Sequence, residues 1–195
     1  MFFLLCGLVP WKWFSSTLNS GSRSIVANAG LINQVYLPKY IFPLIVVVIN
    51  TFKFTLVFPV LLLILILSGF ELSNTWWSLL PVLAIQLMMV ASCTCLLSCL
   101  VPYLPDLRYV IDNGMLLLMF LSGVFFSIDA MAPEIRSILL LNPIALLLEC
   151  YREILLEGSM PNLNDLAYVI FISFLTGISA VFLLKRIDRK VIKEL

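Results

Sequence analysis

The sequence predicts an all-α protein built as a polytopic bundle of transmembrane helices. Of its 195 residues, 62% are hydrophobic and 12% are charged, whereas a soluble domain has about 25% charged residues. Several apolar stretches approach or exceed the roughly 20 residues that a helix needs to cross the hydrocarbon core. Because that core offers the backbone no hydrogen-bond partner, we expect these stretches to be helices. The composition excludes a soluble globular fold.

About five spans are expected, and together they make residues 1–195 a single membrane domain. They cover residues 2–16 (a partial span), 41–68, 79–101, 109–126 and 166–184. Trp76 and Trp77 close the turn before the third span, which is a position that indoles prefer at the membrane interface. Residues 127–165 contain only short apolar segments, and these are typical of re-entrant or interfacial helices rather than of spans.

The distribution of basic residues predicts the orientation, because cytoplasmic loops carry an excess of Lys and Arg. Residues 185–195 hold five of them, residues 22–40 hold Arg23 and Lys39, and residues 102–108 hold Arg108. Residues 127–165 lie on the opposite side and carry only two basic residues but six acidic ones. We therefore expect a cytoplasmic C-terminus and an outward-facing 127–165 region.

Residues 22–40 show the spacing of a short amphipathic helix that Pro38 stops. Apolar side chains recur at helical intervals between polar ones, at Ile25, Ala29, Ile32, Val35 and Tyr36. Such a helix either lies on the membrane surface or docks a cytoplasmic partner. The periodicity does not distinguish the two.

Motifs for enzyme chemistry are absent from the sequence. It has no phosphate-binding GxxxxGK[ST] motif, no histidine, and no pair of acids within a predicted span. The three clustered cysteines (Cys93, Cys95 and Cys99) lack the polar, converging fourth ligand that a zinc site needs. We therefore expect no catalytic activity, no cofactor and no metal, and the net charge of +1 gives no indication of nucleic-acid binding.

Lys53 lies near the middle of the 41–68 span. A charge at that depth costs at least about 2.5 kcal/mol on insertion scales. Lys53 either faces a wet cavity and meets an anionic substrate, or is paired within the bundle or snorkels along its stem. Both interpretations stay open.

Four ordered stretches resemble the membrane subunit of ABC-2-type exporters. The similar branch moves lipid-linked O-antigen, capsule or teichoic-acid polymers. The stretches are Gly7-Leu-Val-Pro-Trp11 with Phe14; Ser24 to Asn28 through Val35-Tyr-Leu-Pro38 and Pro43; Asp106-Leu-Arg108 with Leu121-Ser-Gly123; and Asn142-Pro143 with Glu149, Tyr151-Arg152, Gly158 and Pro161. The resemblance covers nearly the whole chain in the family's order.

The resemblance implies a division of labour. Two permease copies would form the channel in a bacterial inner membrane, two copies of a separate ATPase would bind beneath it, and lipid-linked glycan would pass through. The coupling residues would be Ile25, Asn28, Ile32, Val35, Tyr36 and Pro38, and the outer gate residues Asn142, Pro143, Glu149 and Arg152. Glu149 and Arg152 are three residues apart and are expected to pair on one helix face.

Aromatic rings are candidates for the pathway of such a cargo, because sugars present C–H faces that stack on them. Phe54 and Phe58 lie beside Lys53 in the same span. Two other functions stay open: an ABC-2 exporter of drugs or small lipids, and a non-transporting truncated fragment or membrane scaffold. The last follows from the family pattern, in which an amphipathic segment and a first span usually precede the stretch at Gly7.

Overall fold

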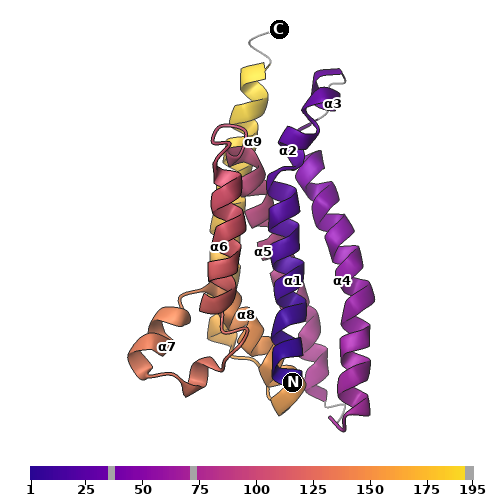
Figure 1. Ribbon diagram of the computed structural model, residues 1–195, viewed down its shortest axis with the longest axis vertical. Coiled ribbons are helices and arrows are strands. Elements are labelled where there is room, and N and C mark those ends of the chain that lie inside the picture. The colour runs from indigo at the N-terminus through magenta and orange to yellow at the C-terminus, as the bar shows by residue number, and fades with distance from the viewer. Residues whose placement is uncertain (35–37, 71–73, 192–195) are drawn as a thin grey trace.

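The computed structural model describes residues 1–34, 38–70 and 74–191, and these fold into helices without a strand. Five long helices form the bundle: α1 (Phe2–Ser22), α4 (Ile41–Leu67), α5 (Leu79–Leu100), α6 (Leu107–Leu121) and α9 (Leu163–Val191). In Figure 1, α1 lies between α6 and α4, and α5 and α9 lie behind them. The most extensive packing is between α5 and α9, followed by α1 against α4 and α5. The all-helical prediction is confirmed.

Three helical segments of the described chain are long and apolar enough to cross a membrane: Ile41–Leu67, Asn74–Leu100 and Leu163–Lys185. Their outward side chains are large and apolar; Val48 is 67% exposed and Phe182 is 64% exposed. A soluble monomer does not expose such continuous apolar surface. The chain is therefore a multi-pass membrane protein.

Two helices end at other positions than the spans that the sequence predicts. The first helix was expected to end near residue 16, but α1 continues to Ser22. Its polar residues fit inside the helix because Thr17 Oγ1 donates to the Trp13 carbonyl at 2.6 Å, and hydroxyls satisfied in this way tolerate burial. The span expected at 109–126 is helical only from Leu107 to Leu121. Gly123 then turns the chain with φ +65°. The 15 residues of α6 make the helix about 22 Å long.

The two ends of the bundle carry different segments. The short helices α2 (Ser24–Ala27) and α3 (Ala29–Gln34) lie at the same end as the C-terminus. At the opposite end, with the N-terminus, lie η1 (Asn74–Ser78), η2 (Ile128–Ala130), α7 (Pro133–Leu139), α8 (Pro143–Arg152) and the π-helix η3 (Glu153–Glu157). Residues 22–40 are named the coupling segment, and residues 127–165 the gate segment, after the roles that the sequence resemblance leads us to expect.

Candidate functional site

The coupling segment is not the single helix that its periodicity predicts. Asn28 interrupts it, with backbone angles φ −108° and ψ 18° that end α2 before α3 begins. The Asn28 side chain turns back and donates from Nδ2 to the Ser24 carbonyl at 2.7 Å. An asparagine that bonds its own backbone favours helix ends over helix interiors. Asn28 therefore divides the segment into two short helices.

The structure also separates the predicted coupling residues by exposure. Ile25 is 7% exposed and packs inward, and α2 contacts α1, α4 and α5. Ile32 is half-buried. Two large apolar side chains of α2 and α3 are exposed, Val26 at 50% and Leu31 at 46%. Sequence periodicity did not single these two out.

The remaining predicted coupling residues lie at the junction with α4. Val35 and Tyr36 fall outside the described residues. Pro38 is described, and its carbonyl accepts a hydrogen bond from the Ile41 backbone N–H at 3.1 Å, where α4 begins. Their contact with a partner stays a prediction.

An ion pair ties the coupling segment to α6. The Arg23 guanidinium at the start of α2 donates from Nη2 to Asp112 Oδ2 on α6. Both side chains are more than 40% exposed, so the pair contributes at most about 1 kcal/mol to stability. The pair is of interest for its position, because it connects the coupling segment to a helix 89 residues further along the chain.

Asn142 and Pro143 begin the gate helix α8. Asn142 Oδ1 accepts from the Ile144 backbone N–H at 3.1 Å, which is the capping geometry that stabilises a helix start, and Pro143 occupies the first turn. Asn142 Nδ2 donates to Ser122 Oγ at 2.8 Å. The start of α8 is thereby fixed to the end of α6.

Arg152 is the most heavily engaged polar residue of the gate segment. It is 2% exposed. Its Nη1 donates to Glu149 Oε1 at 2.9 Å, and its Nη2 donates to the carbonyls of Gly123 at 2.7 Å and Val124 at 3.2 Å. The guanidinium carbon also lies 3.7 Å from the centroid of the Phe3 ring. The expected Glu149–Arg152 pair is confirmed, and Arg152 additionally joins α8 to the turn after α6 and to α1.

Burial and charge act on Arg152 in opposite directions. Desolvation lowers the pKa of its guanidinium, and the adjacent Glu149 carboxylate counteracts that shift. A buried cation is tolerated when hydrogen bonds and a counter-charge satisfy it. The Arg152 cluster therefore positions the gate segment rather than presenting a charge to solvent.

A hydrogen-bond chain through Gln86 connects three helices and was missed by sequence reasoning. Gln86 on α5 is 1% exposed. Its Nε2 donates to the Pro10 carbonyl of α1 at 3.0 Å, and its Oε1 accepts from the Tyr151 hydroxyl of α8 at 2.6 Å. Burial raises the pKa of Tyr151 well above its usual value, so the hydroxyl stays a donor. The sequence did contain a signal for it, because a single amide side chain within an apolar span indicates a polar partner on another helix.

Replacing Gln86 by leucine is expected to destabilise the bundle by about 1–2 kcal/mol. The change leaves the buried Tyr151 hydroxyl unpaired, and hydrogen bonds between membrane helices are worth up to about that much. Thermal unfolding in detergent measures the loss. The double variant Gln86→Leu, Tyr151→Phe removes both partners and is expected to recover part of the stability. If the loss of stability in the double variant equalled the sum of the losses in the two single variants, the Tyr151–Gln86 hydrogen bond would be contradicted.

One pocket of the described structure is an open one that is lined by two lysines. It lies between α1 and α4, has a volume of about 680 Å³, and includes Lys12, Lys53 and Phe54. Sequence reasoning singled out Lys53 and Phe54 but passed over Lys12, because α1 was read as a partial span. Phe58 is 7% exposed and packs on Tyr151 with ring centroids 6.2 Å apart. The Phe58 ring is part of the core and does not line this pocket, and its place on a cargo pathway stays a prediction.

Comparison with known proteins gives consistent matches. The family model of the ABC-2 type transporters matches residues 1–156. The O-antigen export system permease protein RfbA of Klebsiella pneumoniae is 27% identical over 157 residues, which are 80% of this chain and 61% of that protein. The protein of the same name from Myxococcus xanthus is 30% identical over 187 residues, 93% of this chain and 71% of the relative.

A polysialic acid transport protein matches over a similar length. The polysialic acid transport protein KpsM of Escherichia coli is 30% identical over 186 residues, 91% of this chain and 70% of the relative. The chain thus spans less than two thirds of the Klebsiella relative and slightly more than two thirds of the other two.

Proposed function

We propose that this chain, which belongs to the ABC-2 type transporter family, is the membrane-channel subunit of an ATP-driven exporter. Its cargo is a lipid-linked polysaccharide or polyol-phosphate polymer. The family match over residues 1–156 carries the proposal, because those residues include the whole coupling segment and most of the gate segment. The relatives named for O-antigen and polysialic acid support the polymer class.

The chain is proposed to work without catalysis of its own. Two copies form the channel, two copies of a cytoplasmic ATPase hydrolyse ATP, and the permease itself carries no cofactor. The sequence lacks a GxxxxGK[ST] motif, which supports this division. The proposed location is the bacterial inner membrane, with the coupling segment and the C-terminus in the cytoplasm and the gate segment outside.

The packing supports a route for a push from the ATPase. Val26 and Leu31 are exposed apolar side chains of the coupling segment. Movement there reaches α4 and α5 through the packing of α2 and reaches α6 through the Arg23–Asp112 pair. The far end of α6 holds the gate segment through Ser122, Gly123 and Val124. Rigid helices that carry a displacement between two ends are a known form of switching.

Changing Leu31 to aspartate is expected to prevent co-purification of the ATPase while leaving the permease folded. The substitution puts a charge into a 46% exposed apolar surface, and a docked apolar contact does not tolerate an unpaired charge. The measurement is mass spectrometry of proteins bound to the tagged permease after mild solubilisation. Ile138→Asp is the matched control, because Ile138 is 65% exposed on α7 at the opposite end.

Two results would contradict the proposal. The first is a wild-type chain that binds no protein with a phosphate-binding motif. The second is a deletion strain that accumulates a small amphiphile in place of a polymer on its lipid carrier, which would favour the drug or small-lipid exporter. Retained ATPase binding by Leu31→Asp alone would overturn only the assignment of the docking surface.

A further inference from the structure

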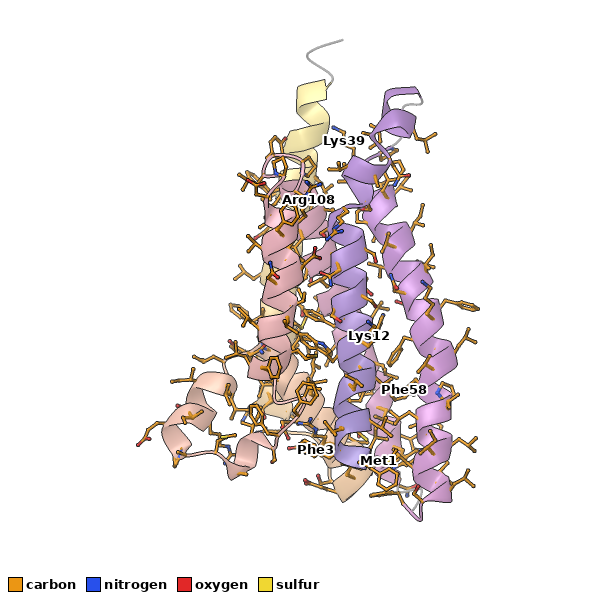
Figure 2. All side chains as sticks on the ribbon, viewed as in Figure 1. Met1, Phe3, Lys12, Lys39, Phe58 and Arg108 are labelled. Atoms are coloured by element: carbon orange, nitrogen blue, oxygen red, sulfur yellow. The ribbon has the colours of Figure 1, made fainter. Side chains whose placement is uncertain are left out.

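The pocket between α1 and α4 contains two positive charges and no negative one. Lys12 comes from α1 and Lys53 from α4, and both line the same pocket. Figure 2 places Lys12 on the side of α1 that faces α4. The other lining residues are apolar, aromatic or neutral polar: Leu8, Val9, Trp13, Ser16, Asn50, Phe54 and Val57. We call this site the lysine pocket.

Both lysines lie at the centres of their helices. Lys12 is ten residues from either end of α1, or about 15 Å along the axis. Lys53 is 12 residues from the start of α4 and 14 from its end, so the nearer end is about 18 Å away. A lysine stem extends much less than these distances, so neither ammonium snorkels to the interface from this position.

Neither charge is compensated within the described part of the chain. No ion pair of Lys12 or Lys53 is found among the described residues, and no acidic residue lines the lysine pocket. In the single chain both lysine side chains are exposed. Lys53 lies at the centre of a helix that is long and apolar enough to cross a membrane, where a charge is costly to desolvate and a second like charge beside it adds repulsion. No partner for Lys53 is therefore found among the described residues. An anion would supply the negative charge that the pocket lacks.

A second observation points to the same kind of ligand. The Trp13 side chain lines the pocket and is 4% exposed, and its indole N–H has no hydrogen-bond partner in the described structure. Buried donors are nearly always satisfied, so an unpaired one calls for an explanation. Trp13 also stacks on Phe54, with ring centroids 4.3 Å apart and planes 17° apart. The pocket thus has donors and cations beside an aromatic wall.

We infer that the lysine pocket binds an oxyanion carried by the exported molecule. Two sources fit: a phosphate on the lipid anchor, or a carboxylate on the sugar chain. The inference rests on the proposed export function, since a phospholipid headgroup resides at the interface and not at the middle of a membrane-crossing helix. Lys12 and Lys53 hold the oxyanion by charge-assisted hydrogen bonds, and the Trp13–Phe54 wall contacts the attached apolar chain or sugar ring.

Equilibrium binding of tritiated geranylgeranyl phosphate tests the inference. The permease is measured as isolated from its native membrane, with any bound ATPase, in nanodiscs of neutral phosphatidylcholine. Geranylgeraniol, which lacks the phosphate, is expected to compete at least about tenfold more weakly. A trisaccharide of sialic acid that competes while maltotriose does not would identify a sugar carboxylate as an accepted anion. Competition by neither sugar would leave the lipid phosphate as the source.

Substitutions locate the site. Lys12→Gln and Lys53→Gln are each expected to weaken binding at least about tenfold, and the double variant is expected to bind no better than geranylgeraniol does. The Lys12→Arg, Lys53→Arg variant keeps the charge and is expected to retain binding, which separates loss of charge from misfolding. Lys185→Gln removes an exposed lysine of α9 that lies outside the pocket, and this variant is expected to bind like the wild type.

Two results would overturn the inference. One is a Lys12→Gln, Lys53→Gln variant that binds geranylgeranyl phosphate within twofold of the wild type. The other is geranylgeraniol that competes as well as its phosphate. The proposed function fails separately, when the wild-type chain binds no ATPase. Export of polymer by the double glutamine variant at the wild-type rate would disprove the role of the pocket while leaving the exporter intact.

Discussion

Replacing Arg152 by glutamine is expected to lower the free energy of unfolding by about 3–5 kcal/mol and to abolish export. The guanidinium is 2% exposed and binds Glu149 and the carbonyls of Gly123 and Val124. Without it, the partly buried carboxylate of Glu149 loses this counter-charge and the two carbonyls lose these donors, and unpaired buried groups are costly. Thermal unfolding in detergent measures the first effect, and polymer at the cell surface measures the second.

Two further variants separate the Arg152 cluster from a simple loss of charge. Arg152→Lys keeps the charge but lacks the planar fork that reaches two carbonyls and a carboxylate together, so an intermediate loss is expected. Arg136→Gln removes an exposed arginine from α7 in the same gate segment and is expected to lower stability by no more than about 1 kcal/mol, which is the limit for an exposed charge interaction. Equal losses for Arg152→Gln and Arg136→Gln would contradict the anchoring role.

The long apolar helices were predictable because glycine, proline or charged residues follow the apolar stretches. The span expected at 41–68 is α4, which ends at Leu67 before Gly69. The span expected at 79–101 corresponds to α5, which ends at Leu100 before Pro102. The last expected span, 166–184, is the apolar part of a longer helix, because α9 continues to Val191 into the charged tail. Hydropathy identifies the apolar part of a helix that can lie in the hydrocarbon core, but it does not identify the full length of the helix.

The functional residues were harder to predict because they depend on how helices face one another. Periodicity placed Ile25 and Ile32 near one face of the coupling segment but gave no direction for that face, and Ile25 packs inward. Gln86 was a visible amide in an apolar span, yet its partners are 76 residues before it and 65 after it. A single sequence carries no signal for pairing across such separations, and Lys12 needed the same information to be matched with Lys53.

Adding a methyl group at Gly21 is expected to destabilise the bundle by about 1–3 kcal/mol through overpacking. A Cβ built at Gly21 would lie 2.1 Å from Cγ2 of Thr94 on α5, which is fully buried. In an open helical position, alanine is more stable than glycine by about 0.5–1 kcal/mol, so the clash reverses the sign. Gly114→Ala on α6 is the matched control, because its Cβ would meet nothing within 4 Å.

A double-mutant cycle identifies the cause of the Gly21 effect. Thr94→Ala removes the methyl group that the new side chain meets, so Gly21→Ala in that background is expected to recover about 1–2 kcal/mol. Additive losses would show that the two helices do not touch at this point. Because Gly21 lies just before Arg23 and α2, forcing α1 away from α5 here also displaces the coupling segment. We therefore expect Gly21→Ala to reduce ATPase co-purification, and Thr94→Ala to restore it together with the stability.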